Sequence, residues 1–103
     1  MERLRRGVRL SEKEILVIKK WAELAFGKGT KVYLFGSRAY LEKKGGDIDL
    51  YVKPTERDNL LERKIKFLAG IWAELGEQKV DVVIETDPER PIERIALKEG
   101  VEL

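Results

Sequence analysis

The stretch LFGSRAYLEKKGGDIDLYV, which runs from Leu34 to Val52, decides the fold that the rest of the chain adopts. A Gly-Ser pair closes one apolar run, nine residues follow, and the triplet Asp47-Ile48-Asp49 opens a second apolar run. Successive side chains of a β-strand point to opposite faces, so Asp47 and Asp49 project from one face while Ile48 projects from the other. Two carboxylates this close repel each other, and a divalent cation between them is the simplest way to relieve the repulsion.

The length and hydropathy of the chain predict a single domain without a membrane anchor. At 103 residues the chain can bury a core but leaves little room for a second substrate-binding domain, so we expect residues 1–103 to form one domain. No stretch approaches the roughly 20 apolar residues of a membrane span, and the start, MERLRRGVRL, lacks the apolar centre of a secretory signal. We therefore expect a soluble, cytoplasmic protein.

The residue counts exclude several kinds of active site. The sequence has no cysteine and no histidine, which rules out disulfides, Cys/His zinc sites, and Ser-His or Cys-His nucleophile pairs. Any chemistry must therefore use carboxylates, hydroxyls, lysine, arginine or bound metal. The chain has 12 Lys, 9 Arg and 14 Glu but one Asn and one Gln, a bias typical of thermophilic proteins. A thermophilic source is therefore a hypothesis, which a melting temperature would test.

The net charge of +2 is unevenly distributed along the chain. Residues 1–10 contain four arginines and one glutamate, which sum to +3, so residues 11–103 sum to −1. The positive excess forms a basic N-terminal arm and not a basic domain, which disfavours a broad nucleic-acid interface. The arm is either a solvated end or edge strand, or a contact for RNA or an acidic partner.

Local patterns predict the element order αβαβαβα. The Ser11-to-Glu14 tetrapeptide has the form of a capping box that starts the first helix, and Trp21 in that helix is expected in the core. Thr55 is expected to cap the long central helix. The predicted elements are helix 12–25, strand 31–35, a short helix within 39–44, strand 47–53, a long helix ending before Gly76, strand 79–84 and helix 92–98. The core-facing stripe expected for the long helix is Leu61, Ile65, Leu68, Trp72 and Leu75.

The third predicted strand carries a lone acid among apolar residues. Its residues Val80, Val82 and Ile84 share one face, which leaves Asp81 on the other. If the second and third strands are neighbours, Asp81 joins Asp47 and Asp49 at one edge of the sheet, and three carboxylates suit Mg²⁺ or Mn²⁺. The alternative is that Asp47 caps the preceding turn while Asp49 pairs with a lysine.

The turn after the first strand is a candidate phosphate-binding site. Gly36 allows close approach of a ligand to the backbone, the amides that follow and the Ser37 hydroxyl form a small anion cradle, and Arg38 adds a positive charge. The alternatives are an ordinary strand-to-helix turn and a surface ion pair of Arg38.

Taken together, these motifs resemble the polymerase-beta-type nucleotidyltransferase superfamily, specifically its minimal nucleotidyltransferases. The resemblance is carried by GSR at 36–38, DID with LYV at 47–52, the lone Asp in KVDVVI at 79–84, and IALKEGV at 95–101. It implies an α+β nucleotidyltransferase fold, a small mixed β-sheet with helices packed on one side. It also implies roles, in which Gly36 and Ser37 hold the β- and γ-phosphates and Arg38 is the basic residue that often follows them. Asp47 and Asp49 would bind both of two metal ions, and Asp81 would bind the catalytic ion and help to activate the acceptor hydroxyl.

The resemblance implies a function as well. The leading prediction is transfer of a nucleoside monophosphate, AMP from ATP, to a hydroxyl with two Mg²⁺ or Mn²⁺ ions. Minimal family members commonly act as antitoxins that adenylylate a tyrosine of a helical HEPN-type toxin, and here that partner or a second copy of the chain would complete the site. One alternative is an inert antitoxin that neutralises its partner by occlusion. Another is an enzyme acting on a small molecule or an RNA end, which the chain length and the absence of a broad basic face disfavour.

Overall fold

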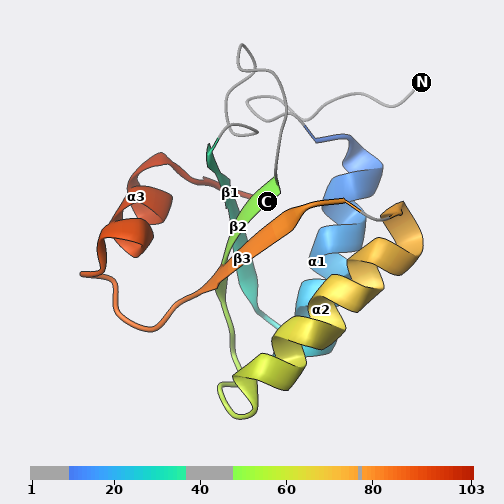
Figure 1. Cartoon of the computed structure of the whole chain (residues 1–103), viewed down its shortest axis with the longest axis horizontal. Helices are drawn as coiled ribbons and strands as arrows, with labels where there is room; N and C mark the ends of the chain where they lie inside the picture. Colours follow the sequence, from blue (N-terminus) through green and yellow to red (C-terminus); the bar gives the residue numbers. More distant parts are fainter. Residues whose placement is uncertain (1–9, 37–47, 77) are drawn as a thin grey trace.

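The computed structural model describes residues 10–36, 48–76 and 78–103. Within these residues, three helices and four strands follow one another (Figure 1). Their bounds are α1 Glu12–Phe26, β1 Lys31–Phe35, β2 Ile48–Lys53, α2 Leu60–Leu75, β3 Val80–Ile84, α3 Pro91–Glu99 and β4 Val101–Glu102. The predicted short helix within 39–44 and residues 1–9 of the basic arm lie outside the described residues, and the prediction of one domain stays a prediction.

The strands form one mixed sheet in the order β3-β2-β1-β4. β1 pairs antiparallel with β2 and with β4, whereas β2 pairs parallel with β3. The predicted α+β class with a small mixed sheet is thus confirmed. β4 was not among the predicted strands because its two residues follow Gly100 directly and contain no periodic signal of their own.

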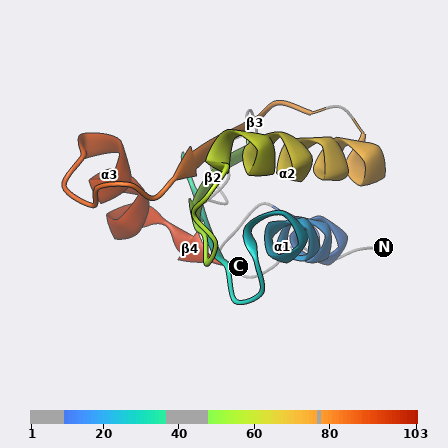
Figure 2. The same cartoon turned by 90° about the horizontal axis from the view of Figure 1, so that it is seen from below.

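The main core lies between the sheet and the two long helices. Alternate residues of the strands, among them Leu34, Leu50 and Val82, pack with the buried faces of α1 and α2, and Figure 2 shows both helices on the same side of the sheet. The rings of Phe26 and Phe67 join the helices, with centroids 5.5 Å apart. Burying this apolar set is the main stabilising contribution to the fold.

α3 lies on the opposite face of the sheet, as Figure 2 shows. Its Ala96 packs against Phe35 and Tyr51, which point away from α1 and α2 because side chains alternate along a strand. The prediction that the helices pack on one side of the sheet therefore holds for the two long helices, α1 and α2. The short helix α3 covers part of the other face. Within the described residues, no helix is long and apolar enough to cross a membrane.

The first helix begins as predicted. The Ser11 hydroxyl accepts a hydrogen bond from the Glu14 amide at 3.2 Å, and the Glu14 carboxylate accepts one from the Ser11 amide at 2.9 Å. This reciprocal pair satisfies two amides that have no partner inside the helix. Trp21 is partly buried against the core, as expected.

The start of α2 differs from the prediction. The helix begins at Leu60, and its cap is Asn59 in a left-handed conformation with φ 53°, not Thr55. The Thr55 hydroxyl instead donates a hydrogen bond to the Phe26 carbonyl at 3.1 Å, so this side chain holds the end of α1. Asn tolerates the left-handed region better than most residues, which explains why it occupies this position.

The predicted core stripe of α2 is wrong for its outer members. Leu61, Ile65 and Trp72 are 72%, 58% and 40% exposed, and the helix buries Phe67, Gly70 and Ile71 instead. Two apolar lines run along this helix at helical spacing, and periodicity alone cannot choose between them. The packing is decided by Gly70, where a Cβ atom would lie 2.1 Å from the Trp21 ring. Leu68 and Leu75 are partly buried against the main core, as predicted. We call the exposed line the outer stripe, which consists of Leu61, Ile65 and Trp72.

Candidate active site

Asp49 and Asp81 lie side by side on neighbouring parallel strands. They are register partners in the β2–β3 pair. Because Leu50 and Val82 are buried in the main core, both aspartates point to the opposite face of the sheet. Asp49 is half-buried and Asp81 is exposed. The second and third predicted strands are thus neighbours, which is the condition for a shared site, and two of the three predicted carboxylates are brought together.

Gly36 lies directly against the Asp49 carboxylate. It follows β1 with φ +77°, and a Cβ atom at this position would be 2.2 Å from Asp49 Oδ2. That separation is far below any van der Waals contact, so the carboxylate occupies the volume that a side chain would need. The glycine is therefore required twice, for its positive φ and for the close approach of Asp49.

The other predicted site residues, Ser37, Arg38 and Asp47, lie outside the described residues, and their roles stay predictions. Within the described parts of the chain, no group of three or more metal-ligating side chains occurs. The donor set that is described consists of carboxylate oxygens, which are the hard ligands that Mg²⁺ and Mn²⁺ prefer. Asp49 and Asp81, on one face of adjacent strands, therefore fit such an ion.

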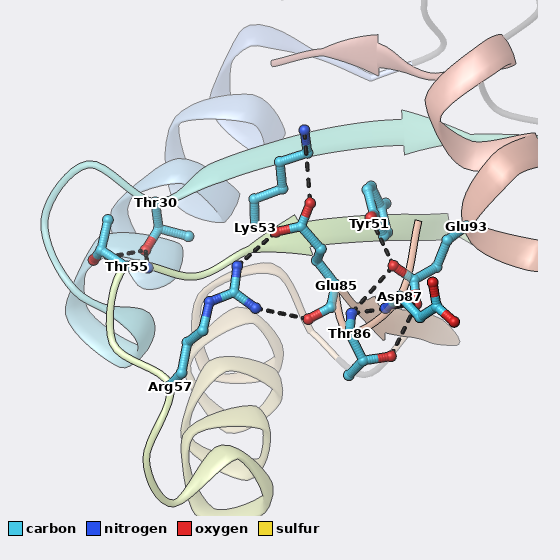
Figure 3. Close-up of polar contacts among 9 residues, drawn as sticks. All are labelled: Thr30, Tyr51, Lys53, Thr55, Arg57, Glu85, Thr86, Asp87 and Glu93. Carbon is cyan, nitrogen blue, oxygen red and sulfur yellow. Dashed lines mark hydrogen bonds and ion pairs between the residues drawn. The ribbon is translucent and has the colours of Figure 1, made fainter. Parts of the chain in front are cut away.

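A buried acid that the sequence did not reveal lies further along the same face. Glu93 of α3 is fully buried, and it accepts hydrogen bonds from the Tyr51 hydroxyl at 2.8 Å, the Thr86 hydroxyl at 2.9 Å and the Asp87 amide at 3.0 Å. Its carboxylate also lies 3.3 Å from Arg90 Nη1. Figure 3 shows Tyr51, Thr86 and Asp87 converging on this carboxylate. The network fastens the start of α3 to the middle of β2.

The hydrogen bonds determine the charge state of this network. Burial by itself would raise the pKa of Glu93, but the bonds from Asp87, Tyr51 and Thr86 together hold the pKa below its ordinary value. The pKa of Tyr51 is raised, first by burial and then by the Glu93 carboxylate that its hydroxyl donates to. Glu93 is thus a buried carboxylate held ionised beside a neutral phenol.

A separate ion-pair group lies at the far end of β2. Glu85 is 3.8 Å from Lys53 Nζ, and its carbonyl and carboxylate both accept hydrogen bonds from Arg57 (Figure 3). Lys53 is four residues beyond Asp49, about 13 Å along a strand. This group ties β2 to the segment that follows β3, at a distance from the two aspartates.

Comparison with known proteins gives one match. A family model described as a nucleotidyltransferase domain matches residues 14–103, which include the whole sheet and all the predicted site residues. Neither the curated proteins nor the solved structures gave a match. The match covers most of the chain, and the mixed sheet with Asp49 and Asp81 on neighbouring strands agrees with it. The chain therefore belongs to the nucleotidyltransferase domain family of the polymerase-beta-like superfamily.

Proposed function

We propose that this protein transfers AMP from ATP to a hydroxyl group of a partner protein. The observation that carries the proposal is the pair Asp49 and Asp81, register partners on one face of β2 and β3, with Gly36 closely packed against Asp49. Members of the family generally use a divalent metal and a nucleoside triphosphate. The two carboxylates thus lie beside the glycine turn that follows β1. Such an arrangement suits the binding of a metal ion and a triphosphate.

Asp49 and Asp81 would hold Mg²⁺ or Mn²⁺, with Asp47 as the third ligand that the sequence predicts. When bound, a pair of such ions polarises the phosphoryl oxygens and favours the ionised form of an attacking hydroxyl. Gly36 and Ser37 would contact the β- and γ-phosphates, and Arg38 would add positive charge there. These assignments of Asp47, Ser37 and Arg38 rest on the family resemblance.

The proposed step is a single displacement at the α-phosphorus. The acceptor oxygen forms a bond to the α-phosphorus. The bond between the α-phosphorus and the oxygen that bridges the α- and β-phosphorus atoms breaks, and pyrophosphate leaves. The hydroxyl proton passes to the Asp81 carboxylate and from there to solvent. Because Asp81 is exposed, a hydroxyl held by another protein can reach it.

We further propose that the acceptor is a tyrosine of a HEPN-type helical toxin, which makes this protein an antitoxin. The support is the resemblance to minimal nucleotidyltransferases, together with the exposure of Asp81, which a hydroxyl of another protein can reach. The test is incubation with Mg-ATP labelled at the α-phosphate and the toxin encoded beside this protein. Transfer of label is expected with wild type but not with Asp81→Asn. Asp58→Asn is the control and should label as wild type does, because Asp58 is an exposed acid just before the start of α2. Equal labelling by Asp81→Asn would refute the mechanism.

A second candidate function is neutralisation by occlusion, without catalysis. It is favoured by the outer stripe of α2, since a line of exposed apolar side chains is a feature of partner-binding surfaces. The two functions differ in one result. If Asp49→Asn and Asp81→Asn protect cells from the toxin as well as wild type does, occlusion is the function.

A further inference from the structure

Among the described residues, β3 is the outermost strand at its end of the sheet, and one side of its backbone has no strand partner there. Ile48 N donates to Lys79 O, and Glu85 N donates to Val52 O, so the odd-numbered residues of this segment turn their backbone groups toward β2. In a parallel ladder the residues between them turn theirs the other way. The N–H and C=O groups of Val80, Val82 and Ile84 therefore point outward, and no hydrogen bond from the described parts of the chain meets them there.

The outer stripe of α2 faces the same way. The side of α2 that contacts α1 carries Arg63, Gly70 and Glu74, which meet Ala25 O and Trp21. At 100° per residue the outer stripe is on the opposite side of the helix from these three residues. Figure 2 shows α2 beside the β3 end of the sheet, with α1 beside the other end. The exposed apolar line and the open strand edge thus border one surface.

Asp81 connects that surface to the candidate site. It lies between Val80 and Val82 on β3. A segment that pairs with the open edge would therefore lie directly beside the strand that carries Asp81. Its side chain points to the face opposite the outer stripe and is exposed. A strand added at this edge would alternate between the two faces, with one set of side chains toward the outer stripe and the other toward Asp81.

We infer that a segment of a partner protein docks as a fifth strand on the open edge of β3. The occupant is an extended segment of a protein in which hydroxyl residues alternate with apolar residues. Its apolar side chains contact the outer stripe, and a hydroxyl is presented to Asp81. Because the site carries the carboxylates of Asp49 and Asp81, the segment has no acidic residue beside that hydroxyl.

Strand geometry allows the contact that this arrangement needs. Neighbouring strands are about 4.8 Å apart, and the Cβ atoms of directly opposed residues are about 5 Å apart. A serine or threonine opposite Asp81 therefore places its hydroxyl at the carboxylate, and a tyrosine reaches it from a diagonal position. Main-chain hydrogen bonds supply affinity, and alternate side chains supply selectivity. The role of the presented hydroxyl rests on the proposed function, whereas the docking does not.

The test uses a synthetic library of nine-residue peptides, with alternating Ser/Thr/Tyr and Val/Ile/Leu positions and a lysine at each end. The library is titrated into ¹⁵N-labelled protein and followed by NMR. We expect the amide signals of Val80, Val82 and Ile84 and the indole signal of Trp72 to shift. Ile65→Lys should weaken binding about tenfold, whereas Leu24→Lys should change it by less than about twofold. Leu24 is the matched control because it is 54% exposed, close to the 58% of Ile65, but lies on α1.

Backbone N-methylation of the peptides separates strand addition from other contacts. Only alternate amides of an added strand face β3, so methylation of either the apolar or the hydroxyl positions should abolish the shifts, and methylation of the other set should not. Abolition by both sets or by neither overturns the inference. So does the absence of shifts at millimolar peptide, or shifts confined to another surface.

Transfer of labelled AMP to the bound peptides is measured separately. Docking with labelling supports the inference and the proposed function together. Docking without labelling supports the inference and contradicts the proposed function for such acceptors. Labelling with no shift at β3 overturns the inference and leaves the proposed function standing.

Discussion

The two faces of the sheet differ although the same strands form both. The face beneath α1 and α2 is apolar and closed, with Leu34 and Leu50 fully buried. The opposite face carries Asp49 and Asp81 at one end, the buried Glu93 in the middle and the Lys53 ion pair at the other, and α3 covers it in part. Alternation along β2 assigns residue after residue to one face or the other. The comparison teaches that stability and chemistry are carried by adjacent residues and can be changed separately.

The largest expected effect is on the closed face. Phe67→Ala removes a fully buried ring that packs edge-on against Phe26. The lost burial and the cavity left behind should lower the free energy of unfolding by about 3–5 kcal/mol. Urea denaturation followed by circular dichroism measures this. A loss below about 1 kcal/mol would mean that the face is not the closed core described here.

Gly36→Ala should have the next largest effect, and it should lower the rate of AMP transfer. The added Cβ must displace the Asp49 carboxylate, and a shift of about 1 Å in a site group typically costs on the order of a hundredfold in rate. The measurement is the rate of AMP transfer. Gly76→Ala is the matched control, because Gly76 has φ +87° but nothing within 4 Å of its Cβ position. It shares the backbone strain without the displacement, so its transfer rate should stay near that of wild type.

Glu93→Gln should destabilise the contact between α3 and the middle of β2, on the face of the sheet opposite α1 and α2. The amide cannot accept the hydrogen bonds of Tyr51, Thr86 and Asp87 as the carboxylate does, which leaves buried donors unpaired. We expect a loss of about 1–3 kcal/mol in the free energy of unfolding. Glu89→Gln, an exposed acid in the same segment, should change it by less than about 0.5 kcal/mol. Equal effects of the two substitutions would show that the network does not hold α3.

The Glu93 network should also make the stability of the protein depend on pH. We expect this effect to be smaller than that of the Glu93→Gln substitution. The pKa of Glu93 is depressed in the folded state, so its contribution is present above the ordinary glutamate pKa and is lost as the pH falls through the depressed value. Between about pH 6 and about pH 3 the melting temperature of wild type should therefore fall more than that of Glu93→Gln. Parallel curves for the two proteins would contradict an ionised Glu93.

The contrast between the faces also explains which features the sequence could predict. Strand alternation placed Asp49 and Asp81 on one face, and the Ser11–Glu14 pattern located the start of α1, because both signals are local. The burial of α2 was assigned wrongly, since two apolar lines have the same spacing and only the contact of Gly70 with Trp21 selects one. Glu93 was missed because its partner Tyr51 lies 42 residues earlier in the chain.

The pairing of Asp49 with Asp81 as a metal site is tested most directly by Mn²⁺ binding in the presence of a non-hydrolysable ATP analogue. Calorimetry needs no knowledge of the acceptor. Wild type should bind Mn²⁺, and Asp49→Asn and Asp81→Asn should each weaken binding about tenfold or more, since each loses a charged ligand. Asp58→Asn should bind as wild type does. Unchanged Mn²⁺ affinity in Asp49→Asn and Asp81→Asn would contradict the site proposed here.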